Sequence, residues 1–209
     1  MQTHISRQPE IAVCMQNVIS IEDMGLKMDQ ATIDELVGNA HGNLARVKEI
    51  ITEHPDLINA TATWKETPVE AAAQMGNRAI IEYLIGQGAP VDFFTALALA
   101  DVVTARQQLN KDSALAQARG VHELPALYFA AIGGSVPAAQ MLLQAGADVN
   151  AKAEAAAPIH GAVMGGNREM VRFLVESGAD LSLPDYKGRD ARSLAVEMGR
   201  NDLAKLIPS

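Results

Sequence analysis

The sequence predicts an all-α solenoid of about six stacked helix-turn-helix units. Three observations lead to this prediction: one phrase recurs along the chain, each copy carries apolar residues at helical spacing, and each copy has a glycine at the same place. The clearest copies are residues 67–92, 125–150 and 157–182, which align without a gap. A chain that repeats one short unit buries its apolar faces by stacking each unit on the next.

Each copy reads as two short helices joined by a tight turn. In the first copy, the apolar residues at helical spacing are Ala71, Ala72, Ile80, Ile81, Leu84 and Ile85. The turn glycines are Gly76, Gly134, Gly166 and Gly199. We expect them to take a left-handed backbone where the first helix ends. Asn77, Ser135 and Asn167 follow directly and are expected to cap the second helix, with Pro137 in a first helical turn.

The spacing of these signals places the second helix of each unit. We expect these helices near residues 43–53, 77–86, 102–109, 135–144, 167–176 and 200–207. The third unit is degenerate, because Asp101 stands at its glycine position only 25 residues after Gly76. This unit therefore lacks about eight residues of the loop that leads into it.

The chain divides into two regions. Residues 1–28 form an N-terminal extension, in which apolar spacing over residues 9–24 predicts a helix that either caps the first unit or contacts a partner. Residues 29–209 form the repeat domain. Its last unit places charged residues on a helix pair that has no following neighbour, which is typical of a capping repeat.

The repeated phrase resembles the ankyrin repeat over about residues 30–207. Its most specific fragments are Gln144-Ala145-Gly146-Ala147-Asp148-Val149-Asn150 and Ser177-Gly178-Ala179-Asp180. The resemblance implies an ankyrin-repeat solenoid and a role in protein–protein interaction. The chain departs from the pattern at Glu70 and Tyr128, where a histidine is usual, whereas His160 retains it. The phrase Trp64-Lys65-Glu66-Thr67 is also similar to a bacterial-type group of ankyrin proteins, and that likeness implies no activity.

Composition and charge limit the partner. With 17 basic and 25 acidic side chains, the chain carries a net charge of -8, so nucleic-acid phosphates and anionic membrane surfaces repel it at long range. It has no stretch of about 18 apolar residues that could span a bilayer. The single cysteine, Cys14, forms no intramolecular disulfide and favours a reducing compartment. We therefore expect a cytoplasmic protein that binds neither nucleic acid nor membrane.

The residues that could perform chemistry stand in no catalytic or metal-binding spacing, so we expect no enzyme, no cofactor and no metal. His160 is expected to bond to neighbouring backbone, as the resemblance implies. His122 and Glu123 fall on a projecting loop, and for them a contact role and a solvated loop are alternative interpretations. The pairs Gly133-Gly134 and Gly165-Gly166 are interpreted as helix turns, because no GK[ST] sequence follows either pair.

We expect a monomeric, non-enzymatic module that binds a partner protein through a concave face of loop tips and inner helix ends. The candidate partner-binding residues are Trp64, Lys65, Glu66, Met75, His122, Glu123, Ile132, Met164, Tyr186, Lys187 and Arg189. Trp64, the single tryptophan, is either an exposed anchor or a packing residue between the first two units. The alternative functions are a regulatory or inhibitory subunit of an enzyme, and an enzyme with an unrecognised site.

Overall fold

The structure is a computed structural model that describes the backbone of residues 21–208 and the side chains from residue 30 onward. The α-helices are α1 (Ile21–Ala40), α2 (Leu44–Glu53), α3 (Pro68–Gln74), α4 (Arg78–Gly86), α5 (Phe93–Ala98), α6 (Val102–Lys111), α7 (Ala126–Ile132), α8 (Val136–Gln144), α9 (Pro158–Gly165), α10 (Arg168–Glu176), α11 (Ala191–Glu197) and α12 (Asn201–Ala204). The short 3-10 helices are η1 (Pro55–Asn59), η2 (Ser113–Gln117) and η3 (Val121–Glu123).

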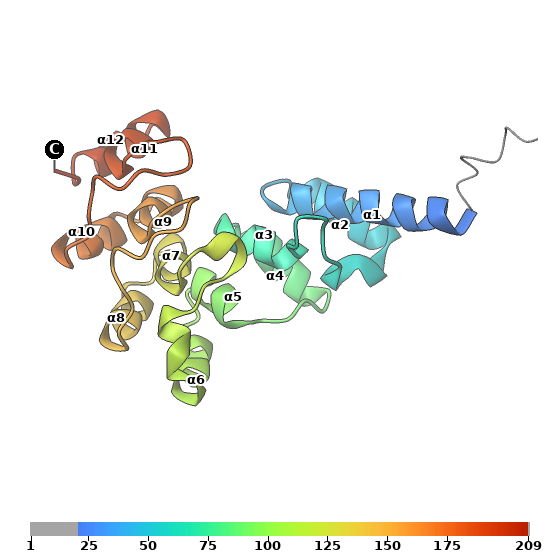
Figure 1. The fold of residues 1–209 in the computed structure, drawn as a ribbon, viewed down its shortest axis with the longest axis horizontal. Coiled ribbons are helices and arrows are strands. Elements are labelled where there is room, and N and C mark those ends of the chain that lie inside the picture. The colour runs from blue at the N-terminus through green and yellow to red at the C-terminus, as the bar shows by residue number, and fades with distance from the viewer. Residues whose placement is uncertain (1–20, 209) are drawn as a thin grey trace, which may run out of the picture.

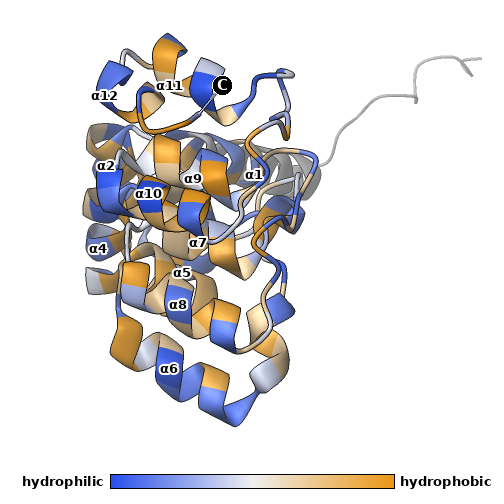
Figure 2. Ribbon diagram, turned by 90° about the vertical axis from the view of Figure 1, so that its left-hand side faces the viewer, coloured by the Kyte–Doolittle hydropathy of each residue, from blue (hydrophilic) through white to orange (hydrophobic). Residues whose placement is uncertain are grey.

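The helices stack in two layers (Figure 1). The odd-numbered helices α1 to α11 contact one another in succession and form the inner layer. Each even-numbered helix packs against the inner helix that precedes it, and together these form the outer layer. The long connecting loops gather along one side of the array (Figure 2). The predicted all-α solenoid is confirmed.

The second, fourth and fifth units share the same local hydrogen bonding at their turns. The backbone is left-handed at Gly76, Gly134, Gly166 and Gly199, with φ between 63° and 75°, as predicted. The side chains of Asn77, Ser135 and Asn167 then accept a backbone N–H from the first turn of the outer helix, which also confirms the predicted caps. These two signals set the sharp reversal between inner and outer helices.

The third unit differs from the prediction by one residue. Its left-handed position is Ala100, with a φ of 60°, and Asp101 is the N-cap of α6. The prediction that Asp101 takes the glycine position is therefore wrong, because Asp101 is equivalent to Asn77. The predicted loss of the leading loop is confirmed, since only residues 87–92 separate α4 from α5.

The two ends of the array also depart from the expected boundaries. Helix α1 runs without interruption through residue 28, where the extension is expected to end. The expected capping helix with Ile11, Met15, Val18 and Ile19 lies outside the described residues. At the other end, α12 stops at Ala204 instead of continuing to residue 207, although Ile207 is still buried.

Small side chains allow the inner helices to pack closely. The inner layer buries alanines completely in every unit with a following neighbour, for example Ala71 and Ala130. A Cβ atom at Gly133 would collide with the carbonyl of Leu97, and one at Gly165 with the carbonyl of Ile132. Adjacent inner helices therefore approach each other backbone to backbone at these glycines, which fits their interpretation as structural residues.

Candidate functional site

The loop face is the surface formed by loops 61–67, 119–125, 152–157 and 184–190 together with the adjoining ends of the inner helices. The third unit contributes no projecting loop to this face. The loop of the fourth unit therefore reaches back to the second unit, where η3 contacts α3. As a result, His122 lies beside Glu66, although a whole unit separates them in the sequence.

Glu66 lies at the centre of a polar cluster. Its exposed fraction is 0%. Gln74 Nε2 donates to Glu66 Oε1 at 2.6 Å, and Trp64 Nε1 donates to Glu66 Oε2 at 2.7 Å. His41 Nε2 lies 3.5 Å from Oε2, and His122 Nε2 lies 3.7 Å from Oε1. These five residues form the Glu66 cluster, in which the first, second and fourth units meet at one carboxylate.

The hydrogen bonds of His41 define which groups of the cluster donate and which accept. Its Nδ1 lies 3.2 Å from the carbonyl oxygen of Gly38, and its Nε2 lies 2.7 Å from Gln74 Nε2. Because a carbonyl accepts and an amide nitrogen donates, a neutral His41 carries its proton on Nδ1. Its Nε2 then accepts from Gln74 and has no proton to give to Glu66. The carboxylate is therefore held by two neutral donors, Trp64 and Gln74.

The loop tips that carry this cluster have a constrained backbone. Lys65, Glu123 and Gly188 occupy equivalent tip positions, and all three have a positive φ. Only glycine takes that conformation freely, so each of the other two costs about 1 kcal/mol. His122 adds a further left-handed residue, with a φ of 53°. Backbone hydrogen bonds from the Ala62 N–H to the Glu66 carbonyl and from the Lys65 N–H to the Ala62 carbonyl close the first of these tips. The side chains beside it are thereby presented in a defined orientation.

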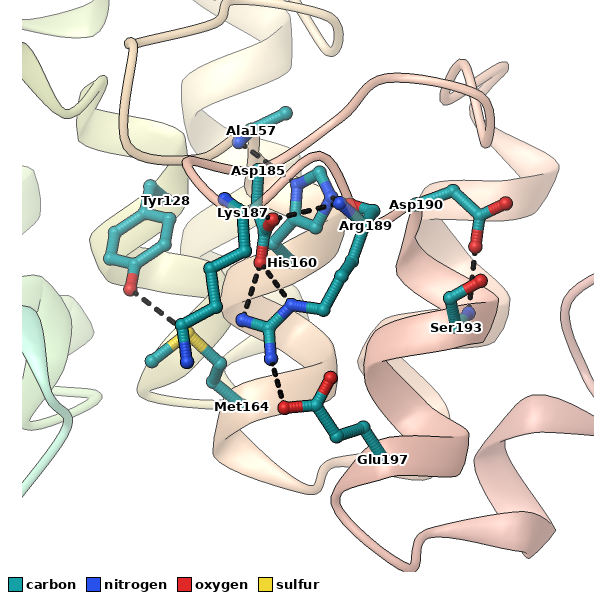
Figure 3. A network of polar contacts seen from close by, with 10 residues as sticks. All are labelled: Tyr128, Ala157, His160, Met164, Asp185, Lys187, Arg189, Asp190, Ser193 and Glu197. Carbon is teal, nitrogen blue, oxygen red and sulfur yellow. Dashed lines mark hydrogen bonds and ion pairs between the residues drawn. The ribbon is translucent and has the colours of Figure 1, made fainter.

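A second polar network lies at the C-terminal end of the loop face (Figure 3). Arg189 donates to Asp185 Oδ2 through Nη2 and to Glu197 Oε1 through Nη1, each at 2.6 Å. Burial raises the pKa of Asp185, but hydrogen bonds from Arg189 and from the backbone N–H of Lys187 outweigh it, so this pKa lies below its ordinary value. The network fastens loop 184–190 to α11.

The two polar groups occupy equivalent positions of the repeat. Glu66 and Gln74 in the second unit align with Arg189 and Glu197 in the sixth, and a hydrogen bond joins each pair. The fourth and fifth units place apolar side chains at these positions, namely Leu124 with Ile132 and Ala156 with Met164. A polar pair therefore replaces an apolar pair near each end of the array.

His160 and Tyr128 tie different units together. His160 Nδ1 accepts the backbone N–H of Ala157 at 3.1 Å, and its Nε2 lies 3.2 Å from the carbonyl oxygen of Arg189. Burial lowers the pKa of His160. The Tyr128 hydroxyl donates to the carbonyl of Gln74 at 3.0 Å, and Met164 Sδ lies close to it (Figure 3). The expected structural role of His160 agrees with these contacts.

The predicted partner-binding residues differ in exposure. Trp64, Lys65, Met75, His122, Glu123, Tyr186 and Lys187 are exposed, and Met164 and Arg189 are partly exposed. Glu66 and Ile132 are buried and present no surface in this arrangement. Placing those two at the surface from sequence was a misassignment. The side chain of Trp64 is 42% exposed, and its indole N–H is bonded to Glu66 of the same loop.

A shallow hollow adjoins the second polar network. It has a volume of about 210 Å³, and Met164, Leu194 and Met198 contribute its apolar lining. Tyr186 stands at its rim with 68% exposure, and the cationic groups of Lys187 and Arg189 lie 5.5 and 5.9 Å from its ring centroid. This part of the loop face could accept an apolar side chain.

The roles of His41 and Gln74 in the Glu66 cluster are not evident from the sequence. His41 reads as an ordinary helix-ending residue, and Gln74 as one more position on the inner helix. The signal that points to the cluster is Glu66 itself, because it places a charge where the fourth and fifth units have Leu124 and Ala156. Comparing equivalent positions between units would have found it.

The described residues hold neither a group of metal-binding side chains nor a helix suited to a membrane. Among the side chains that the structure places, no three histidine, cysteine or carboxylate groups are arranged to hold a metal ion. In the same part of the chain, no helix has the length and apolar character needed to cross a membrane.

Stacked helical pairs with an extended loop face define a class of repeat proteins that present one continuous surface. A family model described as ankyrin repeats, in three copies, matches residues 37–153 and 127–208. The chain belongs to the ankyrin-repeat family.

Relatives in other organisms share this repeat region. The chain is 27% identical over 207 residues to the ankyrin repeat and KH domain-containing protein mask-1 of Caenorhabditis elegans, covering 95% of this chain and 8% of that protein. It is 31% identical over 83 residues to the inactive serine/threonine-protein kinase TEX14 of Mus musculus, covering 39% of this chain and 6% of that protein. It is 36% identical over 69 residues to the potassium channel AKT1 of Oryza sativa subsp. indica, covering 32% and 7%. The chain thus spans less than a tenth of each relative.

Proposed function

We propose that this protein is a non-enzymatic binding module that recognises a partner protein through its loop face. Ankyrin repeats generally mediate protein–protein interaction. The observation that best supports the proposal is Trp64, whose ring is half-exposed on a loop tip while its N–H is bonded to the buried Glu66. An aromatic side chain that is already fixed loses little conformational entropy when a partner covers it.

Tyr186 supports the same surface from the other end of the array. Its ring is exposed, and the cationic groups of Lys187 and Arg189 lie 5.5 and 5.9 Å from the ring centroid. Tryptophan, tyrosine and arginine are the residue types that most often dominate binding energy. We propose that the direct contacts are Trp64, Lys65, Met75, His122, Glu123, Met164, Tyr186, Lys187 and Arg189, presented by a monomer in the cytoplasm.

The test compares capture of proteins from native cell extract by matched variants. Trp64→Ala and Tyr186→Ala each remove an exposed ring, and Val103→Ala removes an exposed apolar group from the outer helix α6. We expect the partner protein to bind the wild type and the control Val103→Ala equally well. It should bind Trp64→Ala and Tyr186→Ala about tenfold more weakly. Quantitative mass spectrometry of the captured proteins measures this difference.

Circular dichroism should show unchanged helical content for all three variants. Arg189→Ala is unsuitable as a binding variant, because its loss would break the network with Asp185 and Glu197. If every protein captured by the wild type is captured equally by Trp64→Ala and Tyr186→Ala, the loop face is not the interface.

A further inference from the structure

The charge of Glu66 is incompletely compensated. A carboxylate can accept about four hydrogen bonds, and the donors bonded to Glu66 are Trp64 and Gln74. The basic side chains that lie within 4 Å of it among the described residues are the imidazoles of His41 and His122, and neither is a lysine or an arginine. Because a buried charge is stable only when it is paired and hydrogen-bonded, this site favours a further cation.

His122 covers the carboxylate without being bonded to it. Its Nε2 is 3.7 Å from Glu66 Oε1, beyond hydrogen-bond distance, and its side chain is 43% exposed. The residue is carried by η3, a short turn with consecutive left-handed residues at His122 and Glu123. The imidazole can therefore leave the carboxylate without breaking a hydrogen bond to it.

The surroundings of that position suit a guanidinium group. Trp64 directs its N–H to the same carboxylate and leaves much of its ring exposed. A guanidinium that takes the place of the His122 ring would bond to the free acceptor positions of Glu66 and lie beside this indole. Arginine combines both interactions, since it pairs with carboxylates through two parallel bonds and stacks on aromatic rings.

We propose that the Glu66 cluster is the binding site for an arginine side chain of the partner protein, which displaces the imidazole of His122. This inference rests on the proposed function and names the chemistry of the partner at one point of the loop face. The net charge of -8 supports a basic partner segment, because it attracts such a segment at long range.

The single tryptophan makes the site directly observable. The indole N–H of Trp64 gives one signal in a ¹H–¹⁵N spectrum of the full chain, and that N–H is bonded to Glu66. The probe is the blocked peptide Gly-Gly-Arg-Gly-Gly at pH 7.5, and the control peptide carries citrulline, which has the shape of arginine without its charge. We expect the arginine peptide to shift this signal saturably and to bind at least about tenfold more tightly than the citrulline peptide.

Variants of the protein test whether the preference for the arginine peptide over the citrulline peptide depends on Glu66. Glu66→Gln should abolish the preference, whereas Glu82→Gln, which removes one exposed charge from the outer helix α4, should retain it. If Glu66→Gln does not fold, the double variant Glu66→Leu with Gln74→Ile, which copies the pair of the fourth unit, replaces it. His122→Gln should retain the preference, because the imidazole donates no bond to the carboxylate.

Equal binding of the two peptides, or an arginine preference that survives in Glu66→Gln, would overturn the inference. Loss of the preference in a folded His122→Gln variant would contradict the displacement of the imidazole. These outcomes are separate from the proposed function. If partner binding depends on Trp64 and Tyr186 but the two peptides bind equally, the loop face is still the interface. In that case Glu66 does not recognise arginine.

Discussion

Ala100 holds the left-handed turn that glycine holds in the second, fourth, fifth and sixth units. A side chain in this conformation costs roughly 1 kcal/mol. Replacing Ala100 with glycine should remove that cost, while the greater freedom of glycine in the unfolded chain offsets about half of the gain. We expect Ala100→Gly to raise the free energy of unfolding by roughly 0.5 kcal/mol. Urea denaturation of the wild type and of the variant measures this difference.

The matched control for this change is Ala96→Gly, a fully buried position inside α5. Glycine there should lower the free energy of unfolding by about 1 kcal/mol or more. A lower stability for both variants would show that the left-handed turn at Ala100 carries no strain.

His160 makes stability depend on pH. It is fully buried, and burial lowers its pKa in the folded chain. The unfolded chain therefore binds a proton at a pH where the folded chain does not, so stability rises with pH in that window. We expect the free energy of unfolding to fall as pH drops below about 6.5, by at most about 1.4 kcal/mol per pH unit from this group.

The measurement is urea denaturation at pH 7.5, 6.5 and 5.5 for the wild type and for His160→Gln. The variant should be less stable at neutral pH, because it loses the bonds to Ala157 and Arg189. Its stability should depend less on pH than that of the wild type. Parallel pH profiles for the two proteins would show that His160 has the same pKa in both states.

At the scale of elements, the two repeat positions held by Glu66 and Gln74 in the second unit join a loop to its inner helix. These positions are polar in some units and apolar in others. Gln74→Ile alone leaves the buried Glu66 with one donor fewer, and an unsatisfied buried group costs about 1–3 kcal/mol. The double variant Glu66→Leu with Gln74→Ile reproduces the pair of the fourth unit. Because a buried polar pair is often replaced by apolar residues without loss, we expect this variant to recover most of the stability.

Thermal and urea denaturation of the wild type and of both variants give the comparison. Recovery in the double variant would show that the Glu66 cluster exists for a purpose other than stability, in agreement with a role in binding. A double variant less stable than Gln74→Ile would instead make the cluster an essential structural contact.

At the scale of the whole molecule, the last unit closes the apolar face of the array. Deleting residues 193–209 removes the buried Leu194, Leu203 and Ile207, and also the bond from Arg200 to the Val163 carbonyl. Each large apolar side chain contributes about 1.5–3 kcal/mol when buried, so we expect a loss of more than about 3 kcal/mol, measured by denaturation. Deleting residues 208–209 is the control and should change little, since Pro208 is exposed. Equal melting temperatures for the two truncations would contradict the capping role.

Local signals are sufficient to predict the solenoid. The turn glycines such as Gly76, the caps such as Asn77 and the apolar spacing of each helix all act within a few residues, and most units repeat them. The prediction for the third unit was wrong by one residue, at Ala100 and Asp101. The left-handed position there is not a glycine, so the spacing of glycines does not mark where the turn lies. Likewise, periodicity does not distinguish a buried loop residue such as Glu66 from an exposed one, since loops carry no regular repeat of apolar residues.

The Glu66 cluster depends on contacts between units that are distant in the sequence. His41, Glu66 and His122 belong to three units, and they meet because the short third unit lets η3 reach α3. The sequence shows the missing loop residues, but how far the neighbouring loop then moves depends on the packing of α5 between α3 and α7. Hydrogen bonds within a short chain segment specify the repeat, so the sequence by itself determines it. The site results from the stacking of whole units, and no local sequence pattern encodes that stacking.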